Sequence, residues 1–281
     1  MEVLRSVTEM QIRATGLKRE GKVIGFVPTM GYLHRGHLSL VELIRAECDF
    51  LVLSIFVNPT QFGAGEDFGK YPRDEKRDLS LCKEYGVDGV FIPDSSEIYA
   101  PDASTYVMEE KVGMGLCGDA RPSHFKGVAT VCAKLFNLCQ PNLVALGQKD
   151  AQQVIVLKRV IRDLHFPIQV MVGPILREKD GLAMSSRNAY LNPKQREEAS
   201  LIYQSLQAAN SLVQDRGFKK VDRVKAEVLQ VLQKGRCIRI NYVEVVDKET
   251  MRTETEIVPG RSLLAVAVWV DQVRLIDNLC F

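Results

Sequence analysis

Short apolar runs alternate with amphipathic stretches through the first two-thirds of the chain. Each run resembles a strand that helices cover on both faces of a parallel sheet. The predicted strands cover residues 23–27, 50–57, 89–92, 143–146 and 168–172. The predicted helices between them cover residues 37–48, 73–85, 125–139 and 151–164. This alternation indicates βαβ units, and so predicts an α/β fold with a Rossmann-type doubly wound parallel sheet, whose ligands bind beyond the carboxyl ends of the strands.

The pattern changes after about Leu176. Two charged amphipathic helices are predicted at residues 193–216 and 221–234, and two alternating, antiparallel strands at 238–246 and 263–270. Pro259 and Gly260 supply a turn between these strands. We therefore expect two domains. Residues 1–175 form the Rossmann-type domain, and residues 176–281 form a smaller C-terminal α+β domain that acts as a lid.

Composition and charge narrow the classes of function. The 281 residues are 46% hydrophobic and 26% charged, which excludes intrinsic disorder. Lys and Arg (37) nearly balance Asp and Glu (35), so the basic surplus of a nucleic-acid-binding protein is missing. No apolar run reaches the roughly 18–20 residues that span a bilayer, and the first residues are charged where a signal peptide is apolar. The seven Cys include no CxxC pair and indicate reduced thiols. These features predict a cytoplasmic protein with no nucleic-acid or membrane partner.

The first motif that indicates a functional site is PTMGYLHRGH, at residues 28–37, where the first predicted strand ends and a helix begins. His34 and His37 stand at the helix entrance, where unpaired N–H groups and the helix dipole favour an anion. Gly31 and Gly36 let the backbone approach a ligand closely. The alternatives are two histidines satisfied by local backbone contacts, or a metal site. The chain has only four His and no HExxH pattern, which argues against a metal site.

The second motif is KDGLAMSSRN, at residues 179–188. Small residues, two hydroxyls and Arg187 suit a loop that wraps a triphosphate, although such a loop on its own is more often plain surface. Together, the two motifs resemble the HIGH and KMSKS-like signatures of the adenylate-forming nucleotidyltransferase superfamily.

Further segments make the resemblance more specific. They are FVNPTQF (56–62), RPSHFKGVATVCAKLFN (121–137), LGQKDAQQ (146–153) and RLIDN (274–278). In this order and spacing, over nearly the whole chain, the set resembles the pantothenate synthetase (pantoate–β-alanine ligase) family. Two positions depart from the family pattern. Arg35 stands where an acidic residue is common, and Cys117 replaces a common Glu before Gly118.

The resemblance implies an ATP-dependent ligase with two half-reactions. Pantoate first attacks the α-phosphate of Mg-ATP, which gives pantoyl adenylate and pyrophosphate. The amine of β-alanine then attacks the acyl carbon and releases pantothenate and AMP. The implied partners are pantoate, β-alanine and ATP with Mg²⁺, whose protein ligands the sequence does not identify, and a second copy of the chain in a homodimer.

The resemblance also implies roles for individual residues. His37, His34 and Lys149 are the expected catalytic residues, with His37 as the general acid. The expected ATP-binding residues are Met30, Gly31, Tyr32, Leu33, His34, Arg35, Gly36, His37, Gly147, Gln148, Lys149, Asp150, Leu176, Met184, Ser185, Ser186 and Arg187. Pantoate is expected to contact Gln61, Gln153 and Asn58, and β-alanine to contact Gln61. Arg121 and His124 either close a gate near the substrate or cap the helix that starts there.

Three other classes of protein remain as alternatives. One is a nucleotidyltransferase of the same superfamily that joins a nucleotide to a phosphorylated acceptor. Another is an aminoacyl-tRNA synthetase, against which length and net charge both argue. The third is a non-catalytic nucleotide-binding relative. ATP–pyrophosphate exchange distinguishes them by the acid on which exchange depends.

Overall fold

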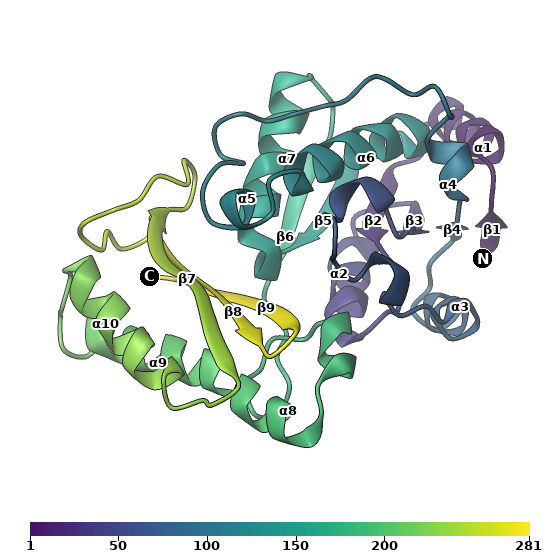
Figure 1. The fold of residues 1–281 in the computed structure, drawn as a ribbon. Helices are drawn as coiled ribbons and strands as arrows, with labels where there is room; N and C mark the ends of the chain where they lie inside the picture. The colour runs from purple at the N-terminus through teal and green to yellow at the C-terminus, as the bar shows by residue number, and fades with distance from the viewer.

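A parallel six-stranded sheet forms the centre of the larger unit in the computed structural model, which describes residues 1–281 (Figure 1). Every neighbouring pair of strands is parallel. The order across the sheet is β1 (Glu2–Leu4), β4 (Gly89–Phe91), β3 (Phe50–Ile55), β2 (Ile24–Thr29), β5 (Leu143–Gly147) and β6 (Gln169–Gly173). The predicted α/β class and doubly wound parallel sheet are confirmed.

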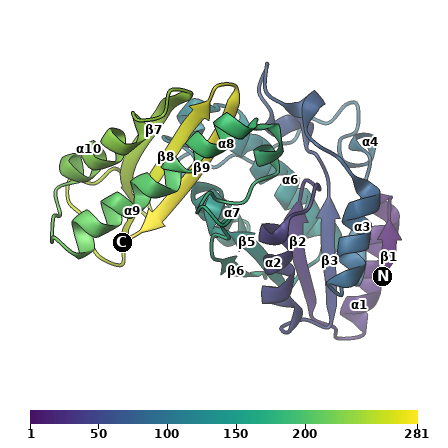
Figure 2. The same ribbon diagram turned by 90° about the horizontal axis from the view of Figure 1, so that it is seen from below.

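Helices cover both faces of this sheet (Figure 2). Because side chains alternate along a strand, Phe26 faces one layer of helices and Val27 the other. The layer on the Phe26 face consists of α1 (Val7–Arg19), α6 (His124–Cys139) and α7 (Ala151–Asp163). The layer on the Val27 face consists of α2 (Arg35–Arg45) and α3 (Glu75–Glu84). Burial on both faces explains why the strands read as continuous apolar runs.

The strand order reverses between β2 and β5. From β2 the chain continues through α2 to β3 on one side, and from β5 it continues through α7 to β6 on the other. The two helices therefore start side by side at the carboxyl edge of the sheet and diverge onto opposite faces. In open α/β sheets, this point of reversal is where ligands bind.

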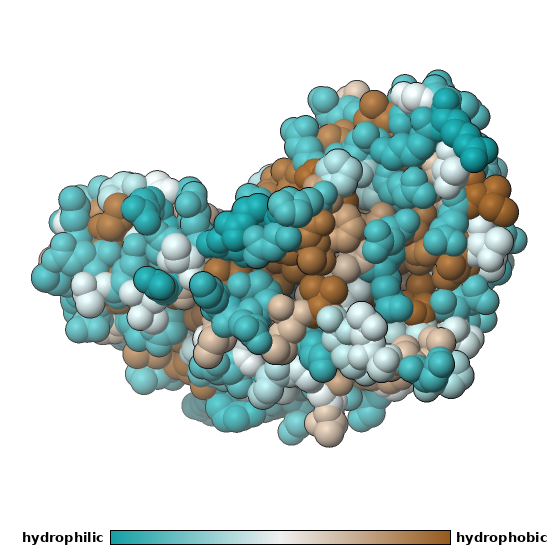
Figure 3. Space-filling model, turned by 90° about the horizontal axis from the view of Figure 1, so that it is seen from above, coloured by the Kyte–Doolittle hydropathy of each residue, from teal (hydrophilic) through white to brown (hydrophobic).

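The smaller unit has a core of its own. Its antiparallel sheet has the order β7 (Ile238–Asp247), β8 (Ser262–Val270) and β9 (Val273–Cys280). It packs against α9 (Leu201–Gln214) and α10 (Val221–Leu232), with α8 (Pro193–Ala199) leading into α9. The space-filling view shows a notch in the outline between the two units (Figure 3).

Several elements differ from the sequence prediction. The predicted helix 193–216 is interrupted at Ser200, whose hydroxyl donates back to the carbonyl of Glu197. β9, β1 and α1 were not predicted, although Ser6 and Glu9 form a capping box that marks the start of α1. The remaining short helices are η1 (Pro59–Gln61), η2 (Phe68–Lys70), α4 (Ser95–Ile98), α5 (Cys117–Ala120), η3 (Gln148–Asp150) and η4 (Ser186–Tyr190). None of the helices combines the length and the apolar character needed to cross a membrane.

Candidate active site

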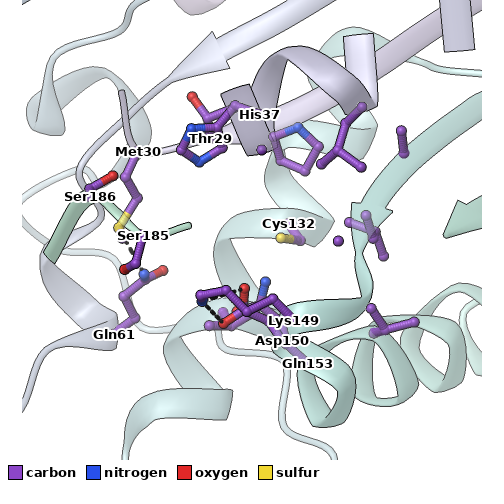
Figure 4. A pocket seen from close by; sticks show the side chains of 18 of the residues that line it. Thr29, Met30, His37, Gln61, Cys132, Lys149, Asp150, Gln153, Ser185 and Ser186 are labelled. Carbon is purple, nitrogen blue, oxygen red and sulfur yellow. Dashed lines mark hydrogen bonds and ion pairs between the residues drawn. The ribbon is translucent and has the colours of Figure 1, made fainter. Parts of the chain in front are cut away.

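A cavity of about 230 Å³ opens at the carboxyl edge of the parallel sheet, where the strand order reverses. It collects side chains from both sequence motifs and from the loops after β3 and β5 (Figure 4). The predicted site residues that line it are Met30, His34, Gly36, His37, Asn58, Gln61, Gly147, Lys149, Asp150, Gln153, Leu176, Met184, Ser185, Ser186 and Arg187. Arg121 and His124 line it as well.

Five predicted ATP-binding residues lie outside the cavity lining: Gly31, Tyr32, Leu33, Arg35 and Gln148. Arg35 points along the surface of α2, where it binds Glu42 and the hydroxyl of Tyr85. The side chain of Gln148 donates to Asn278 on β9. Gly31, Tyr32 and Leu33 form the turn that leads into α2.

Asp78, on the first turn of α3, holds this turn in place. Its carboxyl group accepts the backbone N–H groups of Tyr32 and Leu33, both at 2.7 Å. Gly31 has a φ of +80°, and a Cβ there would lie 2.7 Å from a methyl carbon of Ile55, so the turn requires glycine. Burial raises the pKa of Asp78, and the two N–H donors oppose that shift. Sequence reasoning missed Asp78, because it lies 46 residues from Tyr32 along the chain.

The two histidines form a stacked pair at the start of α2, with ring centroids 3.9 Å apart. His34 is the N-cap, and its Nδ1 accepts the N–H of Gly36 at 3.1 Å. The Nδ1 of His37 accepts the N–H of His34 at 3.3 Å. A neutral imidazole whose Nδ1 accepts carries its proton on Nε2. The local backbone contacts considered as an alternative are therefore present, and they leave an Nε2–H donor on each ring.

Burial sets the charge of this pair. Burial, with a smaller contribution from Lys149, lowers the pKa of His34 to about 4. Burial, His34 and Lys149 lower the pKa of His37 well below its usual range. Both rings are neutral near pH 7 in this structure, so they offer N–H donors to an anion rather than imidazolium charges.

A network of amide groups fixes Gln61 at the end of β3. Asn58 is 1% exposed, and its Nδ2 donates to Oε1 of Gln61 at 3.1 Å and to the carbonyl of Gly127 at 3.2 Å. The Nε2 of Gln61 contacts the sulfur of Met30 at 3.0 Å. Gly127 allows α6 to approach this loop, because a Cβ there would lie 2.4 Å from the carbonyl oxygen of Thr60.

Arg121 and His124 hold the backbone of the same loop. The Nδ1 of His124 donates to the carbonyl of Gln61 at 3.0 Å, which leaves its Nε2 to accept from Arg121 at 3.1 Å. Arg121 donates to the same carbonyl at 3.2 Å and pairs with Glu66 at 2.6 Å. The two roles that the sequence left open for this pair, a gate near the substrate and a cap of the helix, stay predictions. The pair braces Gln61 from the start of α6.

Lys149 and Asp150 lie where β5 ends and α7 begins. The Nζ of Lys149 is 3.2 Å from both carboxylate oxygens of Asp150. Burial opposes ionisation of Asp150, but the charge of Lys149 outweighs it and holds the pKa below its ordinary value. Figure 4 shows Lys149, Asp150 and Gln153 on one side of the pocket and His37 on the other.

The loop from the second motif reaches over the larger unit. The N–H of Met184 donates to the carbonyl of Leu176 at 2.9 Å. The hydroxyl of Ser186 contacts the carbonyl of Tyr32 at 3.4 Å. Arg187 makes a two-bond pair with Asp67, at 2.9 and 2.8 Å. The loop that connects the two units is thus anchored to the larger one at two points.

The family follows from comparison of the whole chain with known proteins. Residues 2–280 match the model of the family described as pantoate-beta-alanine ligase. This chain belongs to the pantoate–β-alanine ligase family. Its activity is therefore the ATP-dependent condensation of pantoate with β-alanine.

The similarity to other pantoate–β-alanine ligases extends over complete chains. The pantothenate synthetase of Thermotoga petrophila is 48% identical over 278 residues, which is 99% of each chain. That of Sulfurihydrogenibium sp. is 49% identical over 282 residues, which is 100% of each. The crystal structure of the Thermus thermophilus enzyme is 44% identical, with a TM-score of 0.93 over 99% of each chain. The Francisella tularensis ligase, complexed with β-γ ATP and β-alanine, is 30% identical, with a TM-score of 0.83 over 100% of this chain and 97% of that one.

The ligase site also includes residues that sequence reasoning left without a role. Asn278, from the RLIDN motif, donates its side-chain amide to the carbonyls of Gln148 and Lys149, at 2.9 and 3.0 Å. Asp277 pairs with Arg177 at 2.6 Å. The RLIDN motif itself was the signal in the sequence for these two residues. What the sequence did not provide was the strand β9 that places it against the loop after β5.

Proposed function

We propose that this ligase works through a pantoyl adenylate that forms and reacts in the same cavity. A carboxylate oxygen of pantoate attacks the α-phosphorus of ATP, and the bond to the bridging oxygen of the β-phosphate breaks, so pyrophosphate leaves. The amine of β-alanine then forms the C–N bond, gives up a proton, and displaces AMP from the acyl carbon. The observation that carries this proposal is the pair of neutral Nε2–H donors at the start of α2, across the cavity from Lys149.

The polar groups around the cavity support an assignment of the ATP site. His34 and His37 present side-chain donors at the start of α2, where the helix dipole favours phosphate. Lys149 faces the same space, and Arg187 lies in the lining of the cavity. Donors fixed in advance around a triphosphate stabilise the charge that grows on the leaving pyrophosphate. Met184, Ser185, Ser186 and Leu176 also line the cavity. We assign the first three to the phosphates and Leu176 to the base.

Three amide side chains of the cavity lining suit pantoate, which has two hydroxyls and a carboxylate. Gln61, Gln153 and Asn58 line the cavity, next to apolar side chains such as Val131 and Leu135. The Nε2 of Gln61 donates only to the sulfur of Met30, a weak acceptor that a substrate oxygen can replace. Gln61 also serves the amine of β-alanine, which must approach the same acyl carbon.

Mg²⁺ is expected to arrive with the nucleotide. No cluster of three or more His, Cys, Asp or Glu side chains suited to a metal ion occurs in the structure. Asp150 is the one carboxylate in the cavity lining. This donor set fits Mg²⁺ held mainly by phosphates and water, which would neutralise phosphate charge. We also propose that two copies of the chain associate as a homodimer.

Pantoate-dependent exchange of pyrophosphate into ATP tests this function. Without β-alanine, the enzyme should exchange labelled pyrophosphate only when pantoate is present. Exchange that depends on an amino acid would indicate a synthetase, and transfer of AMP to a phosphorylated acceptor would indicate another nucleotidyltransferase. No exchange with any acid would overturn the adenylate mechanism.

A further inference from the structure

The backbone N–H groups of the turn between β2 and α2 are bonded within the protein. The N–H of Gly31 donates to the hydroxyl of Thr29 at 3.1 Å. The next two N–H groups, of Tyr32 and Leu33, donate one to each carboxylate oxygen of Asp78. Successive N–H groups that converge on one anion form the kind of concavity in which many proteins bind phosphate. In this chain the concavity holds a carboxylate of the protein itself, so phosphate has to be bound by other donors.

The two histidine side chains are such donors, and their position depends on this turn. The Nδ1 atoms of His34 and His37 accept backbone N–H groups, so the remaining donor on each ring is Nε2. Leu33 directly precedes His34, the N-cap of α2, so the anchor at Leu33 fixes where the helix begins. Both rings line the active-site cavity. Asp78 lines neither this cavity nor the second one, of about 80 Å³, between the start of α7 and the antiparallel sheet of the smaller unit.

The turn needs an anchor because its backbone is left-handed at two consecutive residues. Gly31 has a φ of +80° and Tyr32 has a φ of +50°. Glycine adopts this conformation without steric cost, but in tyrosine the Cβ comes too close to the following carbonyl oxygen. Without partners for its N–H groups, the turn would relax toward a negative φ at Tyr32. That rotation would move the start of α2 and both histidine rings with it.

The surroundings of Asp78 indicate that its carboxylate serves this turn. Asp78 is 1% exposed and shares the buried face of α3 with Cys82. The two N–H groups of the turn are its only side-chain hydrogen-bond partners. The one cation within 4 Å, Arg77, lies 3.9 Å away and is 47% exposed, so solvent screens this ion pair. Burial of a charge costs free energy unless the charge is bonded, and here the bonds come from the turn.

We propose that Asp78 is a positioning residue for formation of the adenylate. Its carboxylate holds the left-handed turn, the turn fixes the start of α2, and α2 presents the Nε2–H groups of His34 and His37 to the phosphates of ATP. The inference rests on the proposed function, because it requires pyrophosphate to leave next to the two rings. Asp78 acts through the histidines, since it lies outside the cavity. Aminolysis, which releases AMP and no pyrophosphate, therefore depends on Asp78 much less.

The test is Asp78→Asn, which has the same shape but only one acceptor oxygen. Its NH₂ group faces an N–H donor of the turn, so one of the two contacts is lost. Pantoate-dependent exchange of pyrophosphate should slow about tenfold or more, as expected for displaced catalytic groups. Aminolysis of synthetic pantoyl adenylate should slow by less than about threefold, because the donors to pyrophosphate take no part in it. Urea denaturation measures the folded fraction to which both rates are referred.

Two substitutions of Tyr32 test the turn while Asp78 stays in place. Valine is strained at a φ of +50°, whereas asparagine tolerates it. Both substitutions remove the tyrosine ring and its contact with the guanidinium of Arg77, so their comparison isolates the backbone. Tyr32→Val should slow exchange about tenfold more than Tyr32→Asn, because strain disfavours the left-handed turn. The two variants should differ little in aminolysis.

The control is Glu84→Gln, at an exposed position on the same helix and outside both cavities. It should change neither half-reaction. Unchanged exchange in Asp78→Asn would overturn the positioning role and leave the proposed function standing. Equal losses of exchange and aminolysis in folded Asp78→Asn would also overturn it, since Asp78 would then support the cavity in general. If Asp78→Asn does not fold, the Tyr32 variants decide, and equal exchange in these two would overturn the role. Failure of the parent enzyme to exchange would instead overturn the proposed function.

Discussion

At the scale of single residues, the histidine pair shows how local structure prepares a chemical group. The Nδ1 atoms of His34 and His37 accept backbone N–H groups, and this fixes each proton on Nε2. The stacking of the rings, 3.9 Å apart, limits their rotation. The pair therefore presents fixed neutral donors, and a donor that needs no reorganisation during the reaction stabilises developing charge most effectively.

This geometry predicts different effects of His37→Ala on the two half-reactions. Formation of pantoyl adenylate should slow by roughly two to four orders of magnitude, because pyrophosphate loses a donor as its charge develops. Aminolysis should suffer much less, because its leaving group is AMP. Single-turnover measurements started from ATP plus pantoate, and separately from synthetic pantoyl adenylate, separate the two steps. The matched control is His165→Ala, at an exposed position outside both cavities. Equal losses in both reactions would contradict this division of roles.

The buried histidines also predict how folding stability depends on pH. Burial lowers the pKa of His34 and of His124 to about 4, whereas an unfolded histidine titrates near 6.5. Between these values the unfolded chain binds more protons, so the free energy of unfolding falls as the pH is lowered from about 6.5 toward 4. Each histidine contributes at most about 1.4 kcal/mol per pH unit.

Urea denaturation between pH 7 and pH 5 measures this dependence. Burial raises the pKa of Asp78 and Asp277. These two carboxyl groups therefore increase the free energy of unfolding as the pH falls, which opposes the effect of the histidines. Comparison with His124→Asn isolates the histidine, because both carboxyl groups are present in both proteins. The variant should lose stability less steeply as the pH falls. Parallel pH profiles for the two proteins would show that His124 is not buried as a neutral group.

At the scale of elements, β9 belongs as much to the active site as to the smaller unit. The side-chain amide of Asn278 donates to the carbonyls of Gln148 and Lys149, so the strand holds the backbone at Lys149, the lysine proposed to be catalytic. Asn278→Ala should slow pantoate-dependent exchange by roughly tenfold or more, since a small displacement of a catalytic group costs up to a hundredfold. Lys149→Ala should itself reduce exchange about a hundredfold or more.

A double-mutant cycle tests whether Asn278 acts through Lys149. Removal of Asn278 should have little further effect on exchange once Lys149 is alanine. Asn137→Ala, at an exposed position on α6, is the control and should leave exchange unchanged. Fully additive losses in the double variant would show that Asn278 supports the fold in general rather than the position of Lys149.

The elements also show what the sequence could predict. Apolar runs such as residues 50–57 are buried on both faces, so their pattern identified β3 and its neighbours in the sheet. In β9, the polar residues Arg274 and Asn278 stand among apolar residues and line a cavity. They interrupt the apolar pattern by which a strand is recognised, so β9 was not predicted. Asp78 and Asn278 are brought to the site only by packing of distant elements. No local signal reports such contacts, whereas the histidine pair and the loop after β5 are continuous motifs.

At the scale of the whole molecule, the link between the two units indicates how the proposed lid would close. The chain leaves β6 and carries the Met184–Arg187 loop before it enters α8. Arg187 is paired with Asp67 in this structure. Closure would then be an exchange of partners, in which Arg187 leaves a carboxylate for a phosphate of ATP. Closure matters because an acyl adenylate hydrolyses when water reaches it.

Limited proteolysis with trypsin tests this movement at two matched sites. Lys179 is exposed on the turn just before the loop, and Lys219 is exposed within the smaller unit, away from both cavities. ATP and pantoate together should slow cleavage after Lys179, because an ordered loop fits a protease poorly, and should leave cleavage after Lys219 unchanged. Asp67→Asn removes the competing carboxylate, so it should speed cleavage after Lys179 without substrates and lower the KM for ATP. Cleavage after Lys179 at the same rate with and without substrates would mean that the connecting loop is fixed and that no lid closes.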